Sequence, residues 1–101
     1  MEKTVGLVDF KVYELGGEKV DTDLLDEAIN HAEKGIPGEV IEVDVKPITD
    51  DEVDCSIRVE CIDSDDDWLD SNRLYDFFLD VSRYMYKHGD YDGDMIDWRV
   101  Y

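Results

Sequence analysis

Four segments of this 101-residue chain alternate apolar with polar residues, and two others repeat apolar residues every three or four positions. Strict alternation predicts a strand with one buried face, whereas the longer spacing predicts an amphipathic helix. In chain order, the predicted elements are a strand over 5–13, a helix from 21 or 22 to 34, strands over 39–48 and 53–63, a helix from 66 or 70 to 88, and a strand over 95–101. The predicted element order is therefore β-α-β-β-α-β.

The alternation assigns one face of each predicted strand to the core, because successive side chains of a strand point to opposite sides. The residues that share the apolar face, strand by strand, are Gly6, Val8, Phe10 and Val12; Ile41, Val43 and Val45; Val53, Cys55, Ile57, Val59 and Cys61; and Ile96, Trp98 and Val100. The acidic connections, 49–52 between the second and third strands and 90–94 before the last strand, are predicted loops.

Each predicted helix begins at residues that suit a helix N-terminus. Asp21 or Thr22 can cap the first helix. For the second helix two starts stay open, one after a capping box from Ser64 to Asp67 and one at Asp70. The predicted apolar stripes are Leu25, Ala28, Ile29 and Ala32 on the first helix, and Leu74, Phe77, Phe78, Val81, Tyr84 and Met85 on the second.

The element order is that of the ferredoxin-like split unit, an α+β fold. Right-handed crossovers place the first and third strands at the centre of a four-stranded antiparallel sheet, with both helices on one face. We therefore expect one acidic α+β domain over residues 1–101. The pair Gly16-Gly17 leaves a second possibility open, a short hairpin onto residues 18–20. Because unrelated functions share this fold, it assigns no function by itself.

The charge of the chain is its main functional signal. Asp and Glu number 28 against 10 Lys and Arg, for a net charge of -18. Small domains usually carry a net charge of about 2–8, and a larger excess destabilises the compact state by self-repulsion. We therefore expect a strongly positive partner to compensate. Direct binding of nucleic acid or of an anionic membrane is excluded, because phosphates would be repelled.

The two cysteines indicate a cytoplasmic compartment. Cys55 and Cys61 share one predicted strand, which separates their Cα atoms by about 20 Å. A disulfide requires a separation below about 7 Å, so both are expected to be buried thiols of a reducing compartment. No apolar run approaches the roughly 20 residues of a membrane span, and the N-terminus lacks the plan of a signal peptide.

The predicted topology concentrates acids at the two ends of the sheet. Three connections meet at one end, with Glu14, Glu18, Asp21, Asp50, Asp51, Glu52, Asp90, Asp92 and Asp94. The opposite end holds Asp63, Asp65, Asp66, Asp67 and Asp70. The open sheet face carries both signs of charge, so cross-strand pairs are expected to balance it. The uncompensated charge should therefore lie at the ends and on the helices.

Carboxylates spaced along loops and helices can approximate the field of nucleic acid, which carries one charge per ~1.7 Å of duplex. In size, charge and its acidic runs at 50–52, 65–67 and 90–94, the chain resembles the small acidic inhibitors that phages direct at host restriction or CRISPR enzymes. The resemblance implies a phage-encoded, non-enzymatic mimic that acts in the bacterial cytoplasm and blocks a basic nucleic-acid channel. The candidate partner-binding residues are Asp50, Asp51, Glu52, Asp65, Asp66, Asp67, Trp68, Asp90, Tyr91, Asp92 and Asp94.

Catalysis, cofactors and metals find little support in the sequence. It contains no phosphate-binding glycine loop and no nucleophile elbow. Two Cys and two His far apart match no zinc spacing. Asp63, Asp65 and Asp67 have EF-hand spacing, but Trp68 and Leu74 stand where the loop needs Gly and Glu. We therefore predict no enzyme, no cofactor and no metal site.

Three alternatives to the inhibitor remain. An immunity protein that neutralises a nuclease toxin would use the same electrostatics, so the partner could be a CRISPR effector, a restriction enzyme or a nuclease toxin. A protein-interaction domain with no inhibitory role would carry its charge only for solubility. Adaptation to high salt would also explain the acids, although the chain has only two Ala and more Lys than Arg. The oligomeric state stays open, a dimer through strand edges included.

Overall fold

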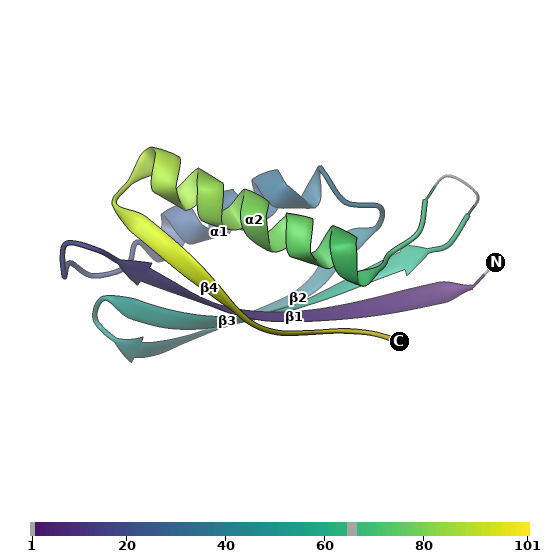
Figure 1. Cartoon of the computed structure of the whole chain (residues 1–101), viewed down its shortest axis with the longest axis horizontal. Helices are drawn as coiled ribbons and strands as arrows, with labels where there is room; N and C mark the ends of the chain where they lie inside the picture. The colour runs from purple at the N-terminus through teal and green to yellow at the C-terminus, as the bar shows by residue number, and fades with distance from the viewer. Residues whose placement is uncertain (1, 65–66) are drawn as a thin grey trace.

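The chain forms one antiparallel sheet with two helices packed on one of its faces (Figure 1). This computed structural model describes residues 2–64 and 67–101. The elements are β1 (Lys3–Glu14), α1 (Thr22–Glu33), β2 (Glu39–Thr49), β3 (Glu52–Ile62), α2 (Ser71–His88) and β4 (Tyr91–Val100). The strand order is β2-β3-β1-β4. The predicted ferredoxin-like α+β fold is therefore confirmed, with the first and third strands at the centre.

The two central strands carry the core as the alternation predicts. Val8 pairs with Ile57, and Phe10 pairs with Cys55, all four with their side chains buried. Both cysteines are free thiols. Burial, followed by the nearby carboxylates, raises the pKa of Cys55 to about 12, so this thiol behaves as a small apolar side chain of the core.

Both helices begin at an aspartate whose side chain accepts backbone hydrogen bonds. The Asp21 carboxylate accepts from the amides of Asp23 and Leu24, each at 3.1 Å, and caps α1. The Asp70 carboxylate accepts from the amide of Arg73 at 2.9 Å and caps α2. The later of the two predicted starts of α2 is therefore right. The predicted stripe of α1 is buried in full, and that of α2 is buried apart from the half-buried Tyr84.

The edge strands differ from the prediction because each contains a bulge. In β2 the register shifts between Val40 and Glu42, so Val40 lies opposite the buried Val59. Ile41, predicted to share a face with Val43 and Val45, is instead the extra residue and is 48% exposed. A bulge adds one residue to one strand and breaks the two-residue period beyond it. Alternation alone therefore predicts Ile41 as the inward residue, where the structure has Val40.

β4 is longer than predicted, and one of its three predicted inward residues, Ile96, does not face inward. Its register with β1 shifts so that Met95 lies opposite Phe10, which leaves Ile96 as the extra residue, 54% exposed. Trp98 and Val100 do lie opposite residues of the inward face of β1, but both remain exposed. An edge strand has a neighbour on one side only, so its apolar residues are less completely covered than those of a central strand.

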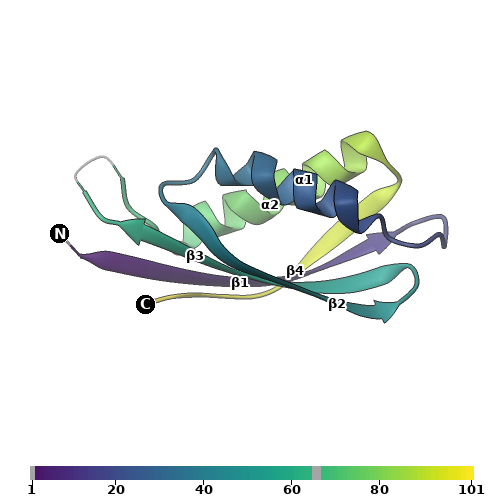
Figure 2. The same ribbon diagram turned by 180° about the vertical axis from the view of Figure 1, so that it is seen from behind.

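The molecule is elongated, with Cα extents of 46 × 22 × 19 Å. The strands run along the long axis, so the connections gather at two well-separated ends (Figures 1 and 2). Residues 18–20 form no strand, so the alternative hairpin after Gly16-Gly17 is wrong. Within residues 2–64 and 67–101, no helix is long and apolar enough to cross a membrane.

Candidate functional site

Three acidic connections meet at one end of the sheet and are joined there by backbone hydrogen bonds. The amide of Val20, in the β1–α1 loop, donates to the carbonyl of Asp50 at 3.0 Å, and the amide of Glu14 donates to that of Asp51 at 2.8 Å. The amide of Leu15 donates to the carbonyl of Asp90 at 2.7 Å. The predicted gathering of these loops is therefore confirmed, and the chain holds them in one arrangement. We call this surface, built from Asp50, Asp51, Glu52, Asp90, Asp92 and Asp94, the acidic end.

The carboxylate of Glu14 shapes the loop behind the acidic end instead of contributing to its surface. Glu14 is the last residue of β1 and is buried. Its carboxylate accepts hydrogen bonds from the amides of Gly16, at 2.8 Å, and Glu18. This side chain therefore holds the tight turn at Gly17, whose φ of 80° lies in the region that glycine adopts most easily.

The segment 90–94 is a strand and not the loop that the sequence predicts. Only Asp90 lies in the connection, because β4 begins at Tyr91. Asp92 lies opposite Tyr13 and Asp94 opposite Lys11, on the open face of the sheet. The acidic end therefore continues from the loops onto this open face.

Tyr13 stands between the acids of β4 and a shallow hollow at the acidic end. Its hydroxyl donates to carboxylate oxygens of Asp92 and Asp94, each at 3.4 Å. Partial burial, with a further contribution from these two carboxylates, raises the pKa of Tyr13. The phenol therefore stays neutral and donates to the acids. Alternation over residues 5–13 predicts that Tyr13 lies on the open face, but its position beside the acids depends on the register of β4.

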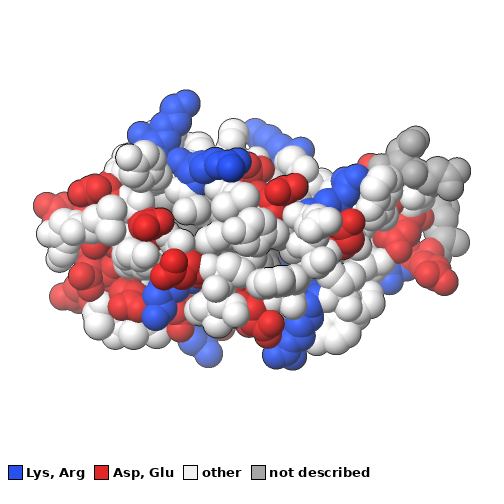
Figure 3. All heavy atoms as spheres, in the orientation of Figure 1, with Lys and Arg blue, Asp and Glu red and all other residues white. Residues whose placement is uncertain are grey.

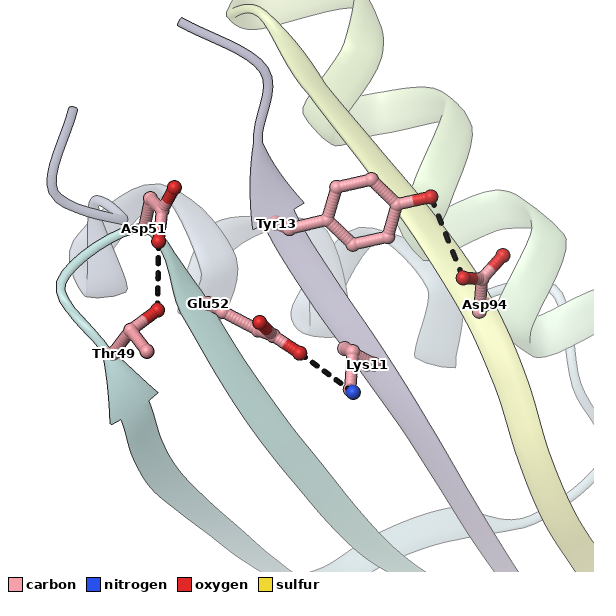
Figure 4. Close-up of polar contacts among 6 residues, drawn as sticks. All are labelled: Lys11, Tyr13, Thr49, Asp51, Glu52 and Asp94. Atoms are coloured by element: carbon pink, nitrogen blue, oxygen red, sulfur yellow. Dashed lines mark hydrogen bonds and ion pairs between the residues drawn. The ribbon is translucent and has the colours of Figure 1, made fainter. Parts of the chain in front are cut away.

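The hollow has a volume of about 330 Å³ and is lined by Lys11, Tyr13, Glu14, Asp51, Glu52 and Asp94. Lys11 is the one cation among the described residues that line it, and the Lys11 Nζ lies 2.6 Å from Oε1 of Glu52 (Figure 4). The hydrogen bond with Glu52 raises the pKa of Lys11, so its charge is retained and is matched by Glu52. Asp51 accepts from the Thr49 hydroxyl at 2.6 Å. The carboxylates of Asp51 and Asp94 keep the hollow negative.

Tyr91 is a core residue and not an exposed anchor for a partner. It is 6% exposed, and its hydroxyl accepts a hydrogen bond from the amide of Asp21 at 3.0 Å. The aromatic ring fills the core under the acidic end while the hydroxyl ties α1 to β4. The interpretation of Tyr91 as a contact residue is therefore corrected, because the extended β4 turns its side chain toward the helices.

We expect Tyr91→Phe to lower the free energy of unfolding by about 1 kcal/mol, since it leaves the Asp21 amide without its acceptor. Urea denaturation followed by far-UV circular dichroism would measure the change. Tyr86→Phe is the matched control, because Tyr86 is 71% exposed and should lose almost nothing. Equal stability of the two variants would show that the hydrogen bond of the Tyr91 hydroxyl does not stabilise the fold at the acidic end.

Asp67 and Trp68, two of the remaining predicted contact residues, lie at the other end of the molecule. Asp65 and Asp66 fall outside the described residues, while Asp67 and Trp68 precede α2. Trp68 is partly exposed; its Nε1 donates to Asp70 at 3.2 Å, and the Arg73 guanidinium lies 4.3 Å from its ring centre. The structure therefore separates the described members of the predicted set into two groups, one at each end of a 46 Å long body.

Ion pairs are concentrated on the open sheet face, as the sequence predicts. Within the described chain, all five pairs join side chains of that face: Lys3 with Glu60, Lys11 with Glu52, Lys46 with Asp44, Arg58 with Glu60, and Arg99 with Asp97. By contrast, Asp50, Asp90 and Asp92 form no ion pair with any described residue. Figure 3 shows acidic side chains gathered over the end of the molecule where these connections meet. The surplus of negative charge is therefore not evenly neutralised.

A cationic hollow between the helices was missed by the sequence analysis. It is lined by His31, Asp80, Arg83, Tyr84, Lys87 and His88. The Tyr84 ring lies 5.1 Å from the His31 ring and 4.3 Å from the His88 ring. The four-residue spacing from Arg83 to Lys87 and from Tyr84 to His88 was the available signal, because such pairs share a helix face. This cluster places the positive groups of Arg83 and Lys87 on α2, and Lys87 lies in its last turn, close in sequence to Asp90 of the acidic end.

Among residues 2–64 and 67–101, no three His, Cys, Asp or Glu side chains form a group that could hold a metal ion. No protein-family model matches the chain, and no curated protein matches its sequence.

Proposed function

We propose that the chain is a non-enzymatic inhibitor that mimics nucleic acid and blocks the basic channel of a host defence enzyme, such as a CRISPR effector or a restriction enzyme. The acidic end enters the channel and competes with the natural nucleic acid. One observation carries the proposal: hydrogen-bonded connections hold Asp50 and Asp90 at one end of the sheet, Asp92 follows at the start of β4, and none of these three acids forms an ion pair with a described residue. A phage-encoded protein acting in the bacterial cytoplasm fits this role.

The dimensions and charge of the molecule support the comparison with a duplex. A duplex 46 Å long carries about 27 phosphates. Over the same length the chain carries 28 carboxylates and a net charge of -18. A channel lined by Lys and Arg would attract such a body from a distance and raise the association rate about 10–1000-fold at low salt.

The fixed backbone of the acidic end also favours binding. A loop that must be ordered on association loses conformational entropy, which weakens the complex. The Asp50–Asp51 turn and Asp90 are already hydrogen bonded to the β1–α1 segment through their carbonyls. Their carboxylates are therefore presented from a framework that needs little rearrangement.

Neutralising the acidic end tests the proposal. We expect Asp50→Asn/Asp90→Asn/Asp92→Asn to weaken partner binding about 100-fold, because each exposed acid that meets a cation contributes to the complex. Asparagine at position 92 keeps the oxygen that accepts from the Gly93 amide. The partner would be captured from bacterial lysate at about 50 mM salt, purified, and titrated at about 50 and 200 mM salt, with duplex DNA and RNA as competitors.

The control variant Glu27→Gln/Glu39→Gln/Asp76→Asn removes the same charge from exposed acids of α1, β2 and α2. It should bind within about threefold of the natural chain. Full binding by the acidic-end variant, or failure of both nucleic acids to compete, would refute mimicry. Weak binding that does not respond to salt would favour the plain interaction domain, and capture of a nuclease toxin would make the chain an immunity protein.

A further inference from the structure

The free edge of the sheet at β2 borders a groove beneath α1. β2 pairs with β3 on one side, and no strand of residues 2–64 and 67–101 lies on the other. The groove has a volume of about 340 Å³ and is lined by Asp26, Ile29, Asn30, Glu33, Val40, Ile41, Glu42 and Val43. Figure 2 shows α1 lying above the side of the sheet along which β2 runs. The groove is thus bounded by a helix and by an open strand edge.

The wall formed by β2 exposes large apolar side chains. Ile41 is 48% exposed, because the bulge displaces it from the core face, and Val43 is 40% exposed. An exposed apolar surface beside polar residues is typical of a site of protein interaction. These two side chains can therefore be covered by a partner without any change in the fold.

The rim of the same groove is acidic. Asp26 and Glu33 come from α1, and Glu42 comes from β2. The Glu33 carboxylate is held in place because it accepts from the Val40 amide at 2.6 Å. The carboxylates of Asp26 and Glu42 form no hydrogen bond or ion pair with any described residue, and no Lys or Arg is among the described residues that line the groove. The groove therefore suits a cationic occupant.

The strand edge provides a regular segment between two irregularities. The pairing of β2 with β3 is interrupted between Val40 and Glu42 and again between Pro47 and Thr49. The stretch from Glu42 to Lys46 is continuous. An extended peptide can add to such an edge through main-chain hydrogen bonds, and its alternate side chains then enter the neighbouring pockets.

From these features we propose that β2 binds an extended segment of the partner in which Lys or Arg alternates with apolar residues, added as a fifth strand. This inference rests on the proposed function, because it assumes a basic partner. The aliphatic stems of the bound Lys or Arg cover Ile41 and Val43, while their charged heads reach toward Asp26 and Glu42. The groove thus gives the partner a second contact, distinct from the acidic end.

A second copy of the chain is a poorer occupant of the edge. Each copy carries a net charge of -18. Self-pairing would bring Glu39, Glu42 and Asp44 of two β2 strands together with Lys46 as the one cation of the strand. Like charges across a strand pair are destabilising, and such edge charges typically prevent self-association.

The test uses the full chain and the synthetic peptide KVRVKVR, followed by NMR of the backbone amides. We expect shifts at residues 40–46 and slower amide exchange over residues 42–46. Ile41→Ser/Val43→Ser should weaken peptide binding about tenfold, and Asp26→Asn/Glu42→Gln should do so by a similar factor with a smaller salt dependence. The matched control is Ile62→Ser/Ile96→Ser, which removes exposed isoleucines outside the groove and should bind normally.

Four results would overturn this proposal. A peptide with proline in place of its central valine could bind equally well, or the chemical shift changes could be confined to the acidic end. The amides of β2 could gain no protection from exchange. Finally, the chemical shifts of β2 could change with protein concentration in the absence of peptide.

The acidic-end variant separates this inference from the proposed function. Asp50→Asn/Asp90→Asn/Asp92→Asn should still bind the peptide at β2 within about threefold. If that variant loses the captured partner while both groove variants keep full affinity for it, mimicry stands and strand addition is wrong. If the groove variants alone lose the partner, strand addition stands and mimicry is wrong.

Discussion

Phe10→Ala should lower the free energy of unfolding by about 4 kcal/mol, in the range measured for buried phenylalanines. Phe10 is fully buried at the centre of β1, and its ring centre lies 5.4 Å from that of Phe78 in α2. The substitution removes the apolar surface that joins the central strand to the helix and leaves a cavity between rigid elements. A loss of this size is a large part of the stability of a small domain.

Urea denaturation followed by tryptophan fluorescence and circular dichroism would measure this loss. Tyr86→Ala is the control, because Tyr86 is an exposed aromatic residue of α2 and its removal should cost less than about 0.5 kcal/mol. A loss below about 1.5 kcal/mol for Phe10→Ala would mean that α2 settles into the cavity. In that event the contact between β1 and α2 does not fix the position of α2, or of Asp90, which follows α2.

Gly38→Ala should lower the free energy of unfolding by about 3 kcal/mol. Gly38 has a φ of 111°, and a methyl group there would overlap the carbonyl oxygen of Glu60 and lie 3.0 Å from the Cα of Cys61. The positive φ costs about 1–2 kcal/mol for a residue with a side chain, and the overlap with a backbone of β3 adds a comparable amount.

Gly17→Ala separates these two contributions. Gly17 also has a positive φ, of 80°, but a methyl group there meets no atom within 4 Å. We expect it to cost about 1–2 kcal/mol. Equal losses for the two variants, measured by urea denaturation, would show that the approach of Gly38 to Glu60 is not a constraint. Amide exchange should rise at the start of β2 in Gly38→Ala, because that glycine lets β2 begin beside β3.

The distribution of charge reconciles a net charge of -18 with a stable fold. The open sheet face, where strands bring side chains close together, contains the ion pairs of the described chain. Acids without an ion pair among the described residues include Asp50, Asp90 and Asp92 at the acidic end, and these three are exposed, so the solvent screens their repulsion. Solvent screening therefore lowers the energetic cost of the charge at the surface proposed to meet the partner.

The meeting of three acidic connections at one end of the sheet was predicted correctly, because it depends on topology. Asp50, Asp51 and Asp90 meet because crossovers of this element order bring their connections to the same end. The element order itself can be predicted from the apolar pattern of the sequence. The sequence predicts a loop at Tyr91 and Asp94, because an aspartate-rich run that contains a glycine usually forms a loop. Pairing with the end of β1 overrides that local preference and extends β4 to Tyr91.

The faces of β1, β3, α1 and α2 follow from the sequence alone, because these elements have neighbours on both sides or one continuous buried stripe. In such elements the apolar residues must alternate or repeat regularly, and this regular pattern is visible in a single sequence. The bulges at Ile41 and Ile96, the burial of Tyr91 and the groove at β2 were decided only by the tertiary structure. An edge strand is covered on one side, so its pattern is weakly constrained, and its register is set by the central strand on which it pairs.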